Sequence, residues 1–523
     1  MPKGLCSETL VVLLLMGASG SPLAAALQLS STPVVIPAQQ QGSNFASDLG
    51  NAGDVNGDGY VDLIVGASEY ENGQSQEGNA VLYYGGPAGF STIPDWSVES
   101  DQISAWMGYS VSGAGDVNGD GFADVIVGAF RYTGALAQQG RAFLYLGSSS
   151  GPSTTPDWTT DGEQSGDEYG SSVSSAGDVN QDGFDDVIVA AADVGLYLYL
   201  GSSLGLPTVP SWTFPFPNGS FLSAAAGAGD VNGDGYNDVI VGDVGFSNPE
   251  TAEGRAMIFL GSPVGLEPAP VWQVEGNGEI LVFGQSVASA GDVNADGFDD
   301  VIVGSYQYDG GLTDVGKAWL YLGSPSGPAT APAWTAVGDV DRAWFGWNVT
   351  SVGDVDGDSY DDVAINARNN PTGGRAYVYR GGPAGLEATP AWDSGFNGAN
   401  GVGFSGDLDG DGRGDVLVGL QGVAAHIYST CSNAPIANAG PDRRVKPHEL
   451  VTFNASRTQG GTPPYSYEWD LNGDGIPDAS GLIATFRYTA GDYTAMLTVT
   501  DAWHCVGTDS ASVTTRGKMQ RAP

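Results

Sequence analysis

Basic residues are scarce in this chain of 523 residues, which has 18 Lys and Arg against 61 Asp and Glu. The formal net charge is −43 at pH 7. Such a charge argues against nucleic acid as a partner, because most of the surface would repel a phosphate backbone. Cations are the partners that it favours.

Histidine and cysteine are also rare, with three of each. The histidines are His426, His448 and His504. None has neighbours in a zinc-ligand or catalytic-triad pattern, so we expect structural or exposed histidines and predict no enzyme. Cys6 lies in the leader segment described next. Cys431 and Cys505 could form a disulfide in an oxidising compartment or stay as two unpaired thiols, and spacing alone does not decide between these alternatives.

Long apolar runs are confined to residues 1–26. This segment carries Lys3, an apolar core over residues 10–16 and a small-residue Ala24-Ala25-Ala26 site, which is typical of a cleaved signal peptide. No later apolar stretch is long enough to span a membrane. We therefore expect a secreted or cell-surface protein with no transmembrane segment after signal removal.

One repeated unit dominates the rest of the chain: Gly-Asp-x-Asn/Asp-x-Asp, two or three residues, then an Asp that opens an apolar run such as Leu63-Ile64-Val65-Gly66. The first Asp recurs at intervals of 62, 62, 52, 62, 62 and 53 residues, at Asp54, Asp116, Asp178, Asp230, Asp292, Asp354 and Asp407. Each unit has the pattern of three or four short strands, and no helical period is visible. This period predicts propeller blades or an array.

The seventh unit is incomplete, because the chain passes from the run 423–428 to Cys431 without the Pro-x-Trp strand that ends the other units. Residues 31–37 align with those strands and could supply the missing one. This pairing would close the ring and leave no sheet edge exposed. The sequence therefore predicts an all-β fold with a seven-bladed propeller over residues 27–430.

Each repeated loop places oxygen donors at positions 1, 3, 5 and 9 and a backbone carbonyl at position 7. An all-oxygen set suits Ca²⁺, whereas Zn²⁺ would require Cys and His. Clustered carboxylates without a counterion would also destabilise the fold. The predicted ligands of about seven Ca²⁺ ions are Asp54, Asn56, Asp58, Tyr60 and Asp62; Asp116, Asn118, Asp120, Phe122 and Asp124; Asp178, Asn180, Asp182, Phe184 and Asp186; Asp230, Asn232, Asp234, Tyr236 and Asp238; Asp292, Asn294, Asp296, Phe298 and Asp300; Asp354, Asp356, Asp358, Tyr360 and Asp362; and Asp407, Asp409, Asp411, Arg413 and Asp415.

Two other interpretations of these loops fit less well. An EF-hand shares the first half of the loop, but position 12 of the first loop is Val65 rather than Glu, and the flanks are strands. Hairpin turns without metal are the second alternative, and seven loops in one register argue against it. The sixth loop has Ser359 where the others have Gly. A positive φ there costs roughly 1–2 kcal/mol, so we expect a strained or weaker site.

The segment Phe283-Gly-Gln-Ser-Val287, followed by the acidic loop and apolar run of residues 291–304, resembles an FG-GAP repeat. Such repeats are the blades of the N-terminal propeller of integrin α subunits and of bacterial relatives. The resemblance covers residues 27–430 and implies seven blades, with Ca²⁺ in the hairpin loops of one face and ligand contacts on the opposite face. The fourth repeat departs from it, with Phe221-Leu222 in place of Phe-Gly. Nothing similar to the rest of an integrin follows, so integrin-type signalling is not implied.

Residues 431–523 form a separate unit with alternating strand patterns over 451–456, 465–470 and 491–501. This unit resembles a PKD domain, a small immunoglobulin-like β-sandwich common in secreted proteins. One of its loops repeats the calcium spacing and predicts an eighth site. The predicted ligands are Asp470, Asn472, Asp474, the carbonyl of Ile476, and Asp478.

Aromatic residues indicate where binding could occur. The six Pro-x-Trp tryptophans occupy equivalent strand positions, and we expect them to pack between blades rather than stack on sugars. Binding residues usually lie on irregular loops. In most repeats of this chain such a loop follows the Gly-Ala position. The candidate ligand contacts there are Tyr70, Tyr132, Tyr306 and Tyr308, with ordinary loop packing as the alternative.

We therefore expect a secreted calcium-binding propeller that acts as an extracellular binding or adhesion module for a protein or glycan. One alternative is a calcium-dependent lectin, which would need shallow aromatic pockets repeated between blades. A polysaccharide lyase or glycosidase would need a carboxylate or basic residue with a partner in a central cleft, and the sequence singles out no such pair.

Overall fold

The computed structural model describes residues 27–516 apart from residues 28, 31, 87–88, 217–220, 279–280, 371–372, 396–397, 404–405 and 432. The signal peptide predicted over residues 1–26 lies outside the described residues. The elements of the described part are all strands. Within it, no helix is long and apolar enough to cross a membrane.

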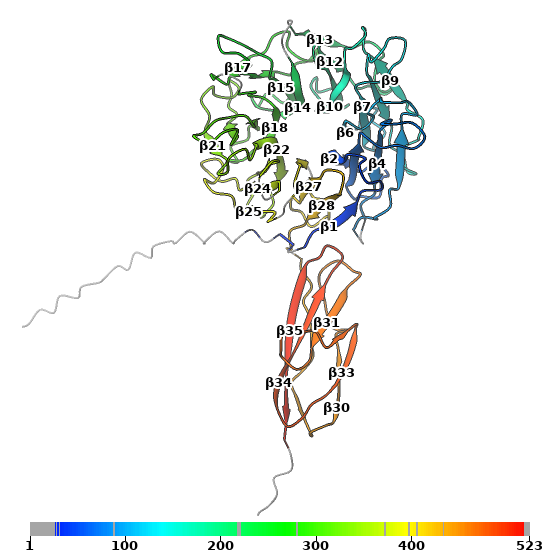
Figure 1. The fold of residues 1–523 in the computed structure, drawn as a ribbon, viewed down its shortest axis with the longest axis vertical. Coiled ribbons are helices and arrows are strands. Elements are labelled where there is room, and N and C mark those ends of the chain that lie inside the picture. The colour runs from blue at the N-terminus through cyan, green and yellow to red at the C-terminus, as the bar shows by residue number, and fades with distance from the viewer. Residues whose placement is uncertain are drawn as a thin grey trace, which may run out of the picture.

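Seven four-stranded sheets, counted over the described residues, lie around a common axis as the blades of a ring (Figure 1). Blade one contains β2 (Phe45–Gly53), β3 (Asp62–Ala67), β4 (Asn79–Tyr83) and β5 (Trp96–Glu99). Blade two contains β6 (Ser110–Gly115), β7 (Asp124–Ala129), β8 (Arg141–Tyr145) and β9 (Trp158–Asp161). Blade three contains β10 (Tyr169–Gly177), β11 (Asp186–Ala191), β12 (Gly195–Tyr199) and β13 (Trp212–Pro215). Blade four contains β14 (Leu222–Gly229), β15 (Asp238–Asp243), β16 (Arg255–Phe259) and β17 (Trp272–Glu275).

The remaining blades follow the same order. Blade five contains β18 (Ser286–Gly291), β19 (Asp300–Ser305), β20 (Lys317–Tyr321) and β21 (Trp334–Val337). Blade six contains β22 (Phe345–Gly353), β23 (Asp362–Ala367), β24 (Arg375–Tyr379) and β25 (Trp392–Asp393). Blade seven contains β26 (Gly401–Gly403), β27 (Val416–Leu420), β28 (Ala424–Tyr428) and, from the N-terminal end, β1 (Val34–Pro37). The all-β propeller predicted from the repeat is confirmed.

The position of a strand within its blade explains its composition. The second strands of blades one to six, such as β3, are buried at every residue, because other blades cover both of their faces. Each contains a continuous apolar run. Inner strands such as β6 carry Ser, Gly and Ala. Their small side chains line an axial cavity of about 650 Å³.

The ring closes as the sequence predicts, because β1 pairs antiparallel with β28 and opposes Val34 to Ile427 and Ile36 to Ala425. The Pro-x-Trp tryptophans pack between blades, as expected. Each indole meets a Tyr or Phe ring of the next blade edge-on, with centroids 4.9–5.1 Å apart, in the pairs Trp96–Tyr145, Trp158–Tyr199, Trp212–Phe259, Trp272–Tyr321, Trp334–Tyr379 and Trp392–Tyr428.

The C-terminal strands form the predicted immunoglobulin-like sandwich, which lies beside the ring next to β1 and β28 (Figure 1). One sheet contains β29 (Arg443–Val445), β35 (Val506–Thr515), β34 (Gly491–Thr500), β31 (Ser466–Asp470) and β32 (Ala479–Ser480). The other pairs β30 (Leu450–Asn454) with β33 (Ile483–Arg487). Their inward side chains surround the fully buried Trp469.

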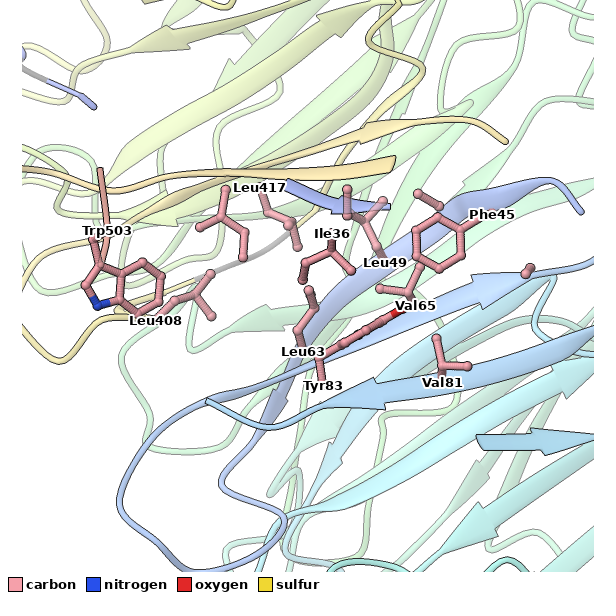
Figure 2. Close-up of a cluster of buried hydrophobic side chains, with 14 residues drawn as sticks. Ile36, Phe45, Leu49, Leu63, Val65, Val81, Tyr83, Leu408, Leu417 and Trp503 are labelled. Carbon is pink, nitrogen blue, oxygen red and sulfur yellow. The ribbon is translucent and has the colours of Figure 1, made fainter. Parts of the chain in front are cut away.

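The turn between β34 and β35 joins the two parts of the protein. Cys505 forms a disulfide with Cys431, with Cα atoms 5.3 Å apart, so the bonded alternative holds. Two residues before Cys505, Trp503 is 2% exposed and packs with Leu408 in the cluster that also holds Leu63 and Tyr83 (Figure 2). The C-terminal domain therefore fills the seam where blade seven meets blade one.

Replacing Trp503 by Ala should lower the free energy of unfolding by about 3–5 kcal/mol, because it leaves a cavity at a buried seam. Urea denaturation followed by far-UV circular dichroism measures the change. Ile93→Ala is the control, since Ile93 is 70% exposed and its loss should stay within about 0.5 kcal/mol. Equal stability of the two variants would show that Trp503 does not support the seam.

Candidate functional site

The seven acidic loops lie on one face of the ring. Each begins where an inner strand ends and stops where the second strand of the blade begins, as in the pairing of Gly53 with Asp62. The opposite ends of these strands, where Phe45 pairs with Ala67, lie at the other face. The fold therefore separates the acidic loops from the loops that follow the second strands.

The carboxylate at position 1 organises each loop. In the first loop, Asp54 Oδ1 accepts hydrogen bonds from the backbone N–H groups of Gly57 and Asp58 at 2.7 and 3.0 Å, and Oδ2 accepts from Gly59 at 2.8 Å. The same bonds from the position 5 and position 6 amides recur in the other six propeller loops. These bonds hold the turn closed and leave carboxylate lone pairs for a cation.

The position 9 carboxylates are fully buried. Asp62 accepts hydrogen bonds from Val55 N–H at 2.9 Å and from Gly85 N–H at 2.8 Å, so it ties its loop to the end of the third strand. Burial raises the pKa of Asp62 to about 7, and that of Asp362 to about 8, above the ordinary value of 3.8. Neighbouring loop carboxylates add to both shifts. A bound cation would offset the cost of ionising these groups.

The donor sets fit a hard cation, which would neutralise the loop carboxylates. Two groups of three carboxylates among the described residues bring a ligand oxygen each within 4.8 Å of one another: Asp354, Asp356 and Asp358, and Asp407, Asp409 and Asp415. The first five loops have Asn at position 3 and do not form such a three-carboxylate group. In the sixth loop Arg380 pairs with Asp356 at 3.1 Å, a competing cation that the spacing did not indicate.

Ser359 adopts the left-handed conformation that the loop requires, with φ of 72° against 89° at the equivalent Gly59. Its N–H still donates to Asp354 Oδ2 at 2.7 Å. The sixth loop therefore keeps the common geometry and bears the backbone strain of a side chain at this position.

Adjacent loops are bonded to one another around the ring. In the second to seventh loops, the position 8 amide donates to the position 1 carbonyl of the loop before it, as Ala123 does to Asp54 at 3.0 Å and Gly414 to Asp354 at 2.8 Å. Among the described residues, Val61 makes no corresponding bond to Asp407. This interrupted step lies at the seam that Trp503 covers.

The loop in the C-terminal domain repeats this pattern. Asp470 accepts from Gly473 and Gly475, each at 2.7 Å, and Asp478 accepts from Leu471 N–H at 2.7 Å. In contrast to the propeller loops, its position 9 carboxylate is exposed. The predicted eighth site has the same turn geometry in a more open setting.

The opposite face carries an aromatic and cationic surface near the axis. We call it the axial surface; it consists of Trp106, Tyr109, Arg131, Tyr306, Trp344, Trp347 and Arg368. Arg131 lies over the Trp106 ring at 4.6 Å, and Arg368 lies over the Trp347 ring at 4.4 Å. Tyr306 packs against both Trp344 and Trp347.

The two halves of the axial surface meet at Tyr109. Burial is the main cause that raises the pKa of Tyr109, with Asp48 and Glu168 adding to the increase, while Arg368 and Arg131 act in the opposite direction. Arg368 comes from blade six and Tyr109 from blade two. Tyr109 is nevertheless 42% exposed, so solvent reaches this part of the surface.

Only one of the four tyrosines singled out in the sequence, Tyr306, belongs to the axial surface. Tyr132 packs beneath Arg141, Tyr308 lies against Lys317, and Tyr70 is half-buried in the seam cluster. Sequence reasoning missed Trp106, Tyr109, Trp344, Trp347, Arg131 and Arg368 as a group. The sequence offers a signal for five of these six. Trp106, Tyr109, Trp344 and Trp347 flank the Phe-Gly position of their repeats, and Arg368 directly follows the second strand of its blade.

Comparisons with known proteins agree with this architecture. A model of the FG-GAP-like repeat matches residues 54–127 and 178–241, a model of the FG-GAP repeat matches 283–321 and 345–379, and a model of the PKD domain matches 432–515. The chain therefore carries FG-GAP repeats and a C-terminal PKD domain.

Curated relatives include integrin alpha chains. Integrin alpha-IIb of Mus musculus is 37% identical over 166 residues, which are 29% of this chain and 16% of the relative. Integrin alpha-V of Gallus gallus is 30% identical over 233 residues, 41% of this chain and 22% of the relative. Integrin alpha-5 of Xenopus laevis is 30% identical over 190 residues, which are 33% of this chain and 18% of the relative. The chain thus matches about a fifth of the length of these relatives.

Substituting Gly for Ser359 should raise the free energy of unfolding by about 1 kcal/mol, because it removes the strain of a side chain at positive φ. Thermal or urea unfolding in calcium buffer measures the gain. The control is Ser326→Gly at an exposed turn position without positive φ, where the added chain entropy should destabilise slightly. A loss of stability in Ser359→Gly would contradict the strain.

The stability of the metal-free protein should fall as pH rises from about 4 to about 8. The unfolded chain releases the position 9 protons near 3.8, whereas the fold holds them until about 7, so the folded state binds more protons in this window. A cation needs the ionised form. The difference in melting temperature between calcium-saturated and chelated protein should therefore widen with pH, and a constant difference would contradict this prediction.

Proposed function

We propose that this chain is a secreted, Ca²⁺-stabilised propeller that acts as an extracellular binding module for a protein or glycan. Cations in the acidic loops stabilise the blades on one face, and the axial surface on the other face contacts the ligand. The observation that carries the proposal is the axial surface itself. It places tryptophan, tyrosine and arginine from separate blades at one accessible place.

One feature supports a binding role for this surface. Trp, Tyr and Arg are the residues most enriched at the energetic centres of protein interfaces. The φ of 57° at Trp106 and Trp344 is not part of this support, because Asn44, Glu168 and Val282 also adopt a positive φ at the equivalent position of other blades.

The similarity to integrin alpha chains supports an adhesion role. The Pro-x-Trp tryptophans support a lectin less well, since they are engaged between blades.

Purified chain should capture a partner from an array of extracellular proteins and glycans in calcium buffer and lose it after chelation. Trp347→Ala should weaken capture about tenfold or more, or about 1.4 kcal/mol, because it removes the centre of the axial surface. Leu204→Ala is the control, since Leu204 is 95% exposed on the acidic-loop face. Equal loss in both variants, or calcium-independent capture, would contradict the proposal.

A further inference from the structure

Arg368 is the most unusual member of the axial surface. It is one of only 18 basic residues in a chain of net charge −43, yet no carboxylate lies within ion-pair distance of it among the described residues. The groups that act on its charge most strongly after burial are the phenols of Tyr109 and Tyr306. A half-buried guanidinium without a carboxylate is costly, and an anion bound from outside would offset this cost.

Its surroundings hold the guanidinium in place and leave donors available. The plane packs on Trp347 at 4.4 Å, and Nη2 donates to Gln421 Oε1 at 2.8 Å. Gln421 in turn bonds to Asn44 of blade one, and Asn44 donates to Ser68 at 2.8 Å. Arginine carries five N–H donors, and the bond to Gln421 uses one of them. The stacked Trp347 ring and the hydrogen-bonded side-chain amides of Gln421 and Asn44 fix the orientation of the guanidinium, as recognition of an anion requires.

We propose that Arg368 recognises a carboxylate presented by a partner protein, with Tyr109 and Tyr306 beside it. The guanidinium forms the paired hydrogen bonds that suit a planar carboxylate. Arg131, over Trp106, adds a second positive charge at the same surface, although Glu168 lies close enough to act on it. This inference rests on the proposed function and names the chemistry of its ligand.

The observations favour a protein carboxylate over an acidic glycan. Arg368 covers one face of Trp347, and Trp344 lies nearly parallel to it at 5.6 Å and 21°, so its faces are engaged and not free to stack on a pyranose. A polyanionic chain would also cross a surface of strongly negative net charge. A single acidic side chain interacts only with the local groups, which are Arg368 and Arg131 together with the carboxylates of Glu168 and Asp48.

The test titrates acetyl-Gly-Asp-Gly-amide and its matched amide, acetyl-Gly-Asn-Gly-amide, into ¹⁵N-labelled chain in calcium buffer. Arginine Nε–H resonances report binding, and the Arg368 resonance is assigned by its loss in Arg368→Gln. The Asp peptide should shift this resonance saturably and the Asn peptide should not. The affinity for the Asp peptide should fall about tenfold or more in Arg368→Gln and in high salt. It should not fall in the control Arg444→Gln, which makes the same charge change at an exposed position of the C-terminal domain.

Three outcomes would overturn the inference. The first is equal binding of the two peptides. The second is unchanged peptide binding in an Arg368→Gln variant whose melting temperature matches that of the parent. The third is tighter binding of glucuronate than of the Asp peptide, which would assign the site to acidic glycans. Array capture separates this failure from that of the proposed function. If Arg368→Gln captures the array partner as well as the parent does, the carboxylate inference fails and the binding module stands.

Discussion

The antiparallel pairing of β1 with β28 is the contact on which the rest of the structure depends. It supplies the fourth strand of blade seven from residues almost 400 positions away and leaves the ring without an open edge. Only a closed ring gives the blades a shared axis. Acidic loops then gather on one face, and side chains from blades two, five and six meet on the other.

Charge is distributed unevenly over the two faces. On the acidic face, backbone hydrogen bonds join neighbouring loops, so the loop carboxylates are concentrated on one side of the ring. Two arginines lie in or beside these loops, Arg413 in the seventh loop and Arg380, which pairs directly with Asp356. On the axial surface the arginines instead stack on indoles and keep donors available. The same residue type thus serves as an internal counterion on one face and as a recognition group on the other.

The sequence predicted the local features that repeat and missed those that arise once. Loop turns, buried second strands, inter-blade tryptophans and the closing strand all follow from residue spacing, because each is decided within a unit or between adjacent units. Arg368 of blade six comes near Tyr109 of blade two only through the curvature of the ring, which no single repeat encodes. Tyr132 and Tyr308 stand at the same place in their repeats and pack against Arg141 and Lys317 of their own blades, whereas Tyr306 stands two residues before Tyr308 and joins the axial surface. The contact of Trp503 with Leu408 depends on how two domains dock, which composition does not reveal.

The Cys431–Cys505 bond also determines how the molecule would respond to tension. A pull on the far end of the sandwich enters the ring through a covalent link just after β28, and so bypasses the packed contacts of Trp503. That link lies next to β28, which is held to the closing strand β1 by four opposed residue pairs. Tension on the sandwich would therefore act directly on the blade that closes the ring.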